Sequence, residues 1–210
     1  MERDGKLILH GPTVPYVVPS QAYLAYMKTQ VKRAIDFGVT AIYLEEPEFW
    51  ARGGYSDTFK KEWQDYYHFP WLPQHEALKE IFSYIKTYSE SKGQRVKCFV
   101  PTHSLLNYSA WEIVSPEASL AALPGMDGYI AQVWTGTARV PNYFNGVKKE
   151  RVFENAFLEY SSVLSMTAPT KKTVYFLTDP IEDGIRSWDD YKKNYEATFT
   201  AELMFPSVNH

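Results

Sequence analysis

The 210-residue sequence has a single cysteine, Cys98, so no disulfide can form within the chain. Cys98 falls in the apolar run of residues 96–100, which favours a small buried side chain over a nucleophile or metal ligand. No run is long and apolar enough to cross a bilayer, and residues 1–6 lack the apolar segment of a signal peptide. We therefore expect no membrane partner, and a cytoplasmic location if the N-terminus is native.

Several motifs with known chemistry are also missing from the sequence. Residues 51–54 contain two glycines but lack the spacing and the lysine of a phosphate-binding loop. There is no His-x-x-x-His, Cys-x-x-Cys or Gly-x-Ser-x-Gly pattern, so neither a metal site nor a serine hydrolase is indicated. The formal charge of −3, with both signs interspersed, gives no basic stripe for nucleic acid. We expect no metal, no cofactor and no nucleic-acid partner.

The composition is that of a globular chain rich in aromatic side chains. Hydrophobic residues make up 45% of the sequence and charged residues 22%, which allows one sizeable core. Aromatic residues reach 16%, and the flat rings and polar edges of Tyr and Trp suit sugar binding as well as protein interfaces. No repeat or linker divides the chain, so we expect a single domain over residues 1–210.

Short apolar runs alternate with longer helical patterns, as in βα units with a mainly parallel sheet. About five strands are expected, at residues 6–10, 40–45, 95–102, 128–134 and 173–178. Helical spacing predicts helices at residues 21–37, 56–67, 76–91, 145–165 and 188–204. The expected fold class is therefore α/β.

Carboxylates follow two of the expected strands. Glu45 ends the strand expected at residues 40–45 and is followed by Glu46 and Glu48, and Asp179 comes directly after the strand expected at residues 173–178. Ligands of parallel α/β proteins bind at the carboxyl ends of the strands, and glycosidic cleavage uses two carboxyl groups. Glu46 and Asp179, each directly before a proline, form the candidate catalytic pair. The alternatives are a solvated acidic loop after the first strand and a turn-capping role for Asp179.

Further polar and aromatic residues at strand ends are candidates for substrate binding. His103 directly follows the strand expected at residues 95–102, while Gln132 and Trp134 are two residues apart on another expected strand and so share a face. Trp50 lies shortly after the acidic segment. With Glu45 and Glu48, these residues complete the predicted sugar site. For His103 a local hydrogen-bonding role remains open, and for Trp134 a role in core packing.

The segment Leu44-Glu45-Glu46-Pro47 resembles the Asn-Glu-Pro motif of retaining glycoside hydrolases with a TIM barrel. The resemblance implies that Glu46 is the acid/base on the fourth strand and that Asp179 is at the nucleophile position on the seventh. Residues 45–50, 108–111 and 131–137 also resemble uncharacterised bacterial glycosidase-like proteins. Two positions depart from the motif, because Glu45 replaces the family's Asn and Asp179 replaces its Glu nucleophile.

Chain length bears on how such a barrel would close. A (β/α)8 barrel takes ~250 residues, so five strands predict a partial or truncated barrel. Its open edges would be covered by a homo-oligomer or by the missing remainder of the barrel. The expected function is hydrolysis of an O-glycosidic bond in a carbohydrate substrate. The alternatives are a non-catalytic carbohydrate-binding or inactive barrel relative, and an oligomerising fragment whose acidic loop lies at an interface.

Overall fold

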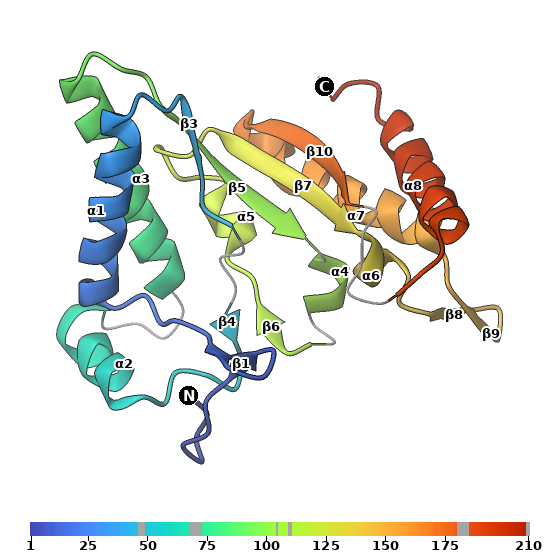
Figure 1. The fold of residues 1–210 in the computed structure, drawn as a ribbon, viewed down its shortest axis with the longest axis horizontal. Helices are drawn as coiled ribbons and strands as arrows, with labels where there is room; N and C mark the ends of the chain where they lie inside the picture. Colours follow the sequence, from blue (N-terminus) through green and yellow to red (C-terminus); the bar gives the residue numbers. More distant parts are fainter. Residues whose placement is uncertain (46–48, 68–72, 104, 109–110, 180–184, 209–210) are drawn as a thin grey trace. The chain divides into compact units, whose positions relative to one another are not determined.

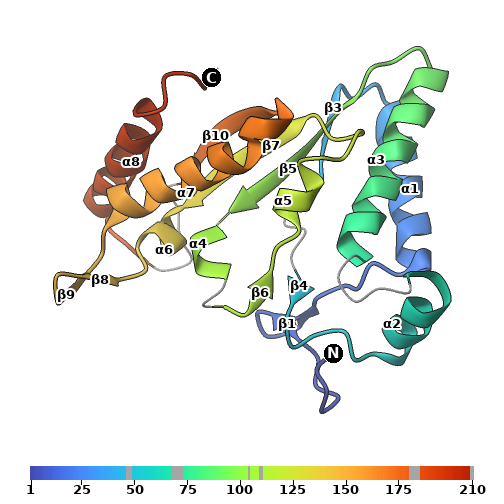
Figure 2. The same ribbon diagram turned by 180° about the vertical axis from the view of Figure 1, so that it is seen from behind.

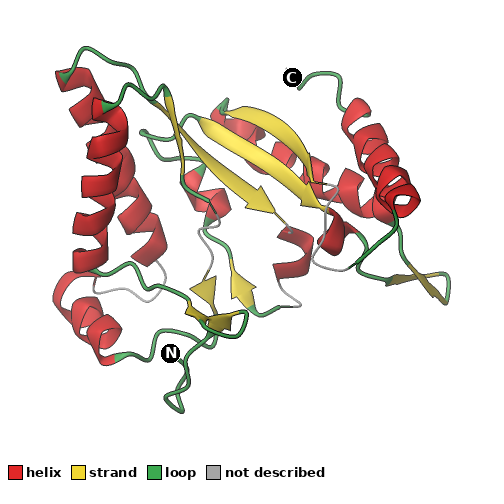
Figure 3. Cartoon of the chain, in the orientation of Figure 1, coloured by secondary structure: helices red, strands yellow, loops and turns green. Residues whose placement is uncertain are grey.

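The computed structural model describes residues 1–45, 49–67, 73–103, 105–108, 111–179 and 185–208 (Figures 1 and 3). The chain splits into two compact units. Unit 1 contains Met1–Ile42, Pro47–Cys98 and Glu112–Met126. Unit 2 contains Tyr43–Glu46, Phe99–Trp111 and Asp127–His210. No helix in the described ranges has the length and apolar character needed to span a membrane.

A four-stranded sheet confirms four of the five expected strands and the α/β class. Its strands, in spatial order, are β10 (Thr173–Asp179), β7 (Gly128–Trp134), β5 (Lys97–His103) and β3 (Ala41–Tyr43). β7 pairs in parallel with both β10 and β5. Lys97 N donates to Thr40 O and Leu44 N to Phe99 O, so β3 runs parallel to β5 as well. The strands thus lie side by side in chain order.

The fifth expected strand, at residues 6–10, is absent from this sheet, and that prediction was wrong. Only Leu9–His10 (β1) is extended, and it pairs antiparallel with Val14–Pro15 (β2). Gly11, with a φ of +67°, turns the chain directly after β1. Ile8 is buried but Leu7 and Leu9 are exposed, so the run has one buried face and lacks the two buried faces of a central parallel strand.

Unit 1 is built around two packed helices, α1 (Gln21–Asp36) and α3 (Pro73–Ser91). Their core side chains are Leu24, Val31, Ile35, Ala77, Ile81, Phe82 and Ile85. The smaller elements are α2 (Asp57–Glu62), a π-helical turn (Trp63–Tyr67), α5 (Glu117–Leu120) and the antiparallel pair β4 (Phe49–Trp50) and β6 (Ile113–Val114). The expected helices at residues 21–37, 56–67 and 76–91 are therefore confirmed with small shifts of their ends.

In unit 2 the helix expected at residues 145–165 starts later than predicted. Residues 142–149 form a hairpin of β8 (Asn142–Phe144) and β9 (Val147–Lys149), and α7 follows at Val152–Thr167. Asn145 and Gly146 both have positive φ, which is the geometry of a tight type I′ hairpin turn. This Asn-Gly signal competes with the helical spacing and prevails locally.

Helices cover one face of the sheet in unit 2. α7 lies against β7 and β10, and α8 (Trp188–Leu203) packs on α7 and β10 (Figures 1 and 2). Tyr129, Ala131 and Val133 are buried, whereas Gln132 and Trp134, at alternating positions, are only partly buried. The short elements α4 (Leu105–Tyr108), α6 (Thr135–Ala138) and a 3-10 turn (Ala168–Thr170) complete the unit.

Candidate functional site

The candidate site lies at the carboxyl ends of β7 and β10. These strands pair over seven residues, from Gly128 opposite Thr173 to Trp134 opposite Asp179, so they end at the same level. Gln132 Nε2 donates a hydrogen bond to Asp179 Oδ2 over 3.2 Å. Three predicted site residues, Gln132, Trp134 and Asp179, are thus brought together, with the carboxylate held by a side-chain amide.

Trp134 packs over the start of α6, and this packing depends on Gly136. A Cβ atom on Gly136 would lie 2.7 Å from Cη2 and Cζ2 of the indole. A larger residue would therefore displace the ring. The indole remains partly exposed beside Asp179, and an apolar ring next to a carboxylate is the combination that binds a sugar face and its hydroxyl groups.

His103 and Glu45 reach the same edge of the sheet through their backbones. His103 is the last residue of β5, and its backbone pairs with Gln132. Glu45 is exposed and follows Leu44, whose backbone N–H donates to Phe99 O over 3.0 Å. Glu46 and Glu48 lie outside the described residues, and so does the distance between the two proposed catalytic carboxyl groups.

Trp50 is placed in unit 1, on β4. Its ring contacts Tyr16 edge-on at a centroid distance of 5.5 Å, and the Arg52 guanidinium lies 5.1 Å from it. The indole Nε1 is buried and has no hydrogen-bond partner among the described residues. The ring contacts of Trp50, with Tyr16 and Arg52, therefore lie within unit 1.

A buried polar cluster beneath the end of β10 was missed by sequence reasoning. Tyr160 of α7 donates to Glu202 Oε1 of α8 over 2.9 Å, and Thr178 Oγ1 donates to the same oxygen over 2.6 Å. Burial raises the pKa of the Tyr160 phenol well above its usual range, and the Glu202 carboxylate adds to the shift. The cluster fixes the residue directly before Asp179.

A second group of hydrogen bonds joins the segment after β7 and α6 to helix α8. Arg139, which follows α6, donates from Nη2 to Asp190 Oδ1 over 3.0 Å and from Nη1 to Asp190 Oδ2. Its Nη2 also lies 3.1 Å from Glu150 Oε2. The hydrogen bonds from Arg139 hold the pKa of Asp190 below its usual value. In the sequence, these contacts of α8 are indicated only by the four-residue spacing of Asp190, Asn194, Thr198 and Glu202, which places polar side chains on one face of the helix.

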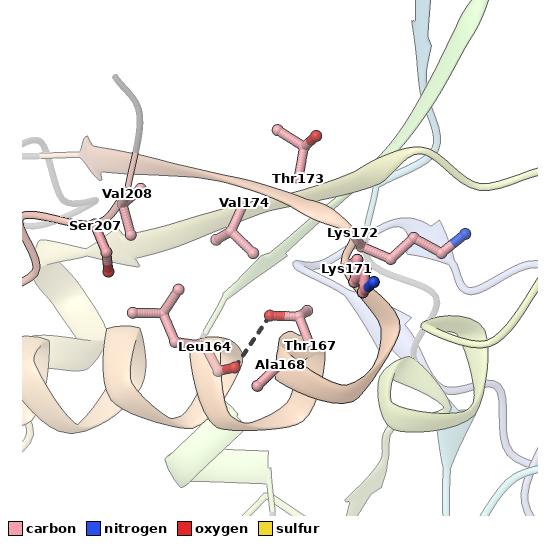
Figure 4. A pocket seen from close by; sticks show the side chains of 9 residues that line it. All are labelled: Leu164, Thr167, Ala168, Lys171, Lys172, Thr173, Val174, Ser207 and Val208. Carbon is pink, nitrogen blue, oxygen red and sulfur yellow. Dashed lines mark hydrogen bonds between the residues drawn. The ribbon is translucent and has the colours of Figure 1, made fainter.

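A cavity of about 420 Å³ lies at the opposite end of β10 (Figure 4). It is lined by Leu164, Thr167, Ala168, Lys171, Lys172, Thr173, Val174, Ser207 and Val208. Thr173 and Val174 begin β10, so the cavity is at the amino edge, away from Asp179. Within the described ranges, no three or more His, Cys, Asp or Glu side chains gather closely enough to hold a metal ion.

The chain was compared with protein-family models, curated proteins and solved structures, and none of them matches it. The relation to TIM-barrel glycoside hydrolases therefore stays a prediction based on the residues of the chain. What the structure establishes is the α/β class and a parallel sheet whose carboxyl edge carries Asp179, Gln132 and Trp134.

Proposed function

We propose that the chain binds a carbohydrate at the carboxyl edge of its parallel sheet and hydrolyses an O-glycosidic bond there. Glu46 acts as the acid/base, and Asp179 acts as the nucleophile or as the base that activates water. The observation that carries the proposal is the grouping of Asp179, its hydrogen-bond donor Gln132 and the partly exposed Trp134 at one strand end.

The order of the strands supports the relation to (β/α)8 barrels. In a doubly wound sheet the strand order reverses at a switch point, whereas barrel strands follow one another in chain order. β3, β5, β7 and β10 follow one another in this way. We infer a partial barrel, with its ligand edge at the carboxyl ends.

The roles of the site residues follow from their chemistry. The hydrogen bond that Gln132 donates orients the Asp179 carboxyl group at the end of β10, where it would act as nucleophile or base. Trp134 would stack against the apolar face of a sugar ring. His103, from β5, and Glu45, after β3, would bind hydroxyl groups at neighbouring positions on the edge.

A panel of aryl glycosides tests this proposal. Glu46→Gln and Asp179→Asn should each lower kcat by about 10²- to 10⁴-fold on any glycoside that the unaltered chain cleaves. Glu154→Gln, on exposed surface of α7, is the matched control and should leave the rate unchanged. Equal rates in all four proteins would refute the hydrolase.

Carbohydrate binding without cleavage is the second candidate. It is favoured because the three residues that the structure groups, Asp179, Gln132 and Trp134, suffice for hydrogen bonding and stacking. Calorimetric titration with oligosaccharides distinguishes the two functions. If the chain only binds, Trp134→Ala should weaken affinity by about tenfold or more, while Glu46→Gln has little effect and no glycoside is cleaved.

A further inference from the structure

The hairpin of β8 and β9 carries exposed aromatic and basic side chains beyond the carboxyl end of β7 (Figures 1 and 2). It belongs to the connection from β7 to α7, and such connections supply ligand-binding residues in parallel α/β proteins. Residues 143–150 are all exposed, and the exposed fractions of Tyr143 and Phe144 are 72% and 62%. Aromatic side chains grouped on a surface in this way indicate that it binds another molecule.

Hydrogen bonds and an ion pair hold the base of the hairpin. Asn142 Nδ2 donates to Asn155 Oδ1 over 2.8 Å, and Asn155 Nδ2 donates to Ala138 O over 2.6 Å. After the second strand, Glu150 Oε2 lies 3.1 Å from Arg139 Nη2. Both strands are therefore fixed where the hairpin joins α6 and α7, and its exposed part is held in a defined position.

The two faces of the hairpin differ in what they contact. Tyr143 pairs with Lys148, and Phe144 pairs with Val147. Neighbouring residues of a strand point to opposite faces, so Tyr143 and Lys148 share one face and Phe144 lies on the other. The Arg151 guanidinium lies 5.2 Å from the Phe144 ring, and the Arg151 side chain is 12% exposed. The Phe144 face is thus turned towards the start of α7, whereas Tyr143 and Lys148 form the open face.

The open face has the chemistry to bind a sugar ring that carries a negative charge. Lys148 Nζ lies 5.6 Å from the centroid of the Tyr143 ring. An aromatic ring binds the apolar face of a sugar, and an ammonium beside it attracts a carboxylate or sulfate. Residues 140–149 contain no Asp or Glu, and Glu150 is paired with Arg139. The local charge is therefore positive and complements an anionic ligand.

We propose that the open face of this hairpin binds an acidic polysaccharide, whose sugar residues carry carboxylate or sulfate groups. The inference rests on the proposed function and names its substrate class. One sugar residue stacks on Tyr143 and places its anionic group at Lys148. The hairpin lies outside the grouping of Trp134 and Asp179 at the strand ends, so a ligand that contacts both is longer than one sugar (Figure 1).

Affinity electrophoresis tests this proposal in gels that contain polygalacturonate or dextran sulfate, with neutral galactan and dextran as their uncharged counterparts. The unaltered chain should bind at least one acidic polymer about tenfold more tightly than its neutral counterpart, and the two acidic polymers distinguish carboxylate from sulfate. Polyglutamate, which has the charge but no sugar rings, should bind more weakly. Tyr143→Ala should weaken binding of the acidic polymer by about tenfold. Lys148→Met removes the charge and should abolish the preference over the neutral polymer.

The matched controls lie on the other face of the same hairpin. Phe144→Ala and Lys149→Met remove the same kinds of side chain from that face. Each should change the affinity by less than about threefold. Circular dichroism verifies that all four variants keep the secondary structure of the unaltered chain.

Several results would overturn the proposal. These are no retardation by either acidic polysaccharide, equal affinity for the acidic and neutral polymers, binding of polyglutamate as tight as that of the polysaccharide, or equal losses on the two faces. Its failure is separable from that of the proposed hydrolase. A chain that cleaves an aryl glycoside but binds no acidic polymer would refute this proposal alone. A chain that binds the acidic polymer but cleaves no glycoside would support it and refute hydrolysis alone.

Discussion

Helices α1 and α8 are alike in length and in how they begin, yet they bury opposite kinds of side chain. Each has 16 residues and starts at a serine cap, where the Ser20 and Ser187 hydroxyls accept from the backbone N–H groups of Tyr23 and Asp190. The buried residues of α1 are Leu24, Val31 and Ile35. Those of α8 are Asn194, Thr198, Ala201 and Glu202.

This comparison shows that the cap of a helix is determined locally, whereas the kind of side chain that the helix buries is determined by the elements packed against it. A serine cap satisfies an unpaired N–H at the first turn whatever the helix packs against. Burial depends on the neighbour instead. α1 meets the apolar face of α3, whereas α8 meets Tyr160, Thr178 and Arg139, whose polar groups need partners. Apolar burial holds α1 in place, and hydrogen bonds hold α8.

The largest expected loss of stability comes from removing a buried apolar side chain of α1. Ile35 of α1 is fully buried, so Ile35→Ala should lower the free energy of unfolding by about 3 kcal/mol, measured by urea denaturation. Tyr26→Ala, at an exposed position of the same helix, should change it by less than about 0.5 kcal/mol. Equal losses at the two positions would contradict the packing assigned to α1.

A smaller loss in the free energy of unfolding is expected when the buried hydrogen bonds of α8 are removed. Glu202→Ala leaves Tyr160 and Thr178 without their shared acceptor, and should cost about 2 kcal/mol. Glu202→Gln keeps an acceptor oxygen at this position and should cost less. The comparison would fail if Glu202→Ala were neutral, because the hydrogen bonds would then not hold α8. Thermal unfolding of both variants in one buffer provides the measurement.

These helices also show how far sequence reasoning reaches. Helical spacing and the serine caps predict α1 and α8 to within a residue or two, and the apolar runs predict β7 and β10. The grouping of Gln132, Trp134 and Asp179 follows, because the carboxyl ends of parallel strands share one edge. The prediction of a strand of the parallel sheet at residues 6–10 was wrong, because the turn at Gly11 brings Leu9 and His10 into antiparallel pairing with Val14 and Pro15.

What sequence reasoning missed depends on three-dimensional register. Gly128 accepts no side chain, since a Cβ would lie 2.1 Å from Thr173 O, and this close approach of β10 to β7 has no signature in the sequence. The meeting of Tyr160, Thr178 and Glu202 depends on where two helices and a strand cross. Spacing along one helix shows that Glu202 shares a face with Thr198, but not what covers that face.

The smallest expected effect concerns the acid sensitivity of the two helices. Asp36 ends α1 and binds Lys32 and Tyr88, while Asp190 in the first turn of α8 binds Arg139. Both carboxyl groups have a pKa below the usual value, in each case chiefly through these hydrogen bonds. A lowered folded-state pKa means that each contribution to stability is complete above about pH 5 and is lost as pH falls through about 4 and below.

The partners of these two carboxylates predict that they differ in how much stability is lost in acid. Arg139 is buried and keeps its charge, whereas Lys32 is half-exposed and its ion pair is screened by water. Asp190→Asn should therefore flatten the fall in melting temperature between pH 5 and pH 3 more than Asp36→Asn does. Differential scanning calorimetry at a series of pH values measures both slopes. If Asp36→Asn flattened the dependence of melting temperature on pH more, the pair of Arg139 and Asp190 would stabilise the chain less than the surface ion pair of Lys32 and Asp36. The contrast between α1 and α8 would then be limited to the kind of side chain that each helix buries.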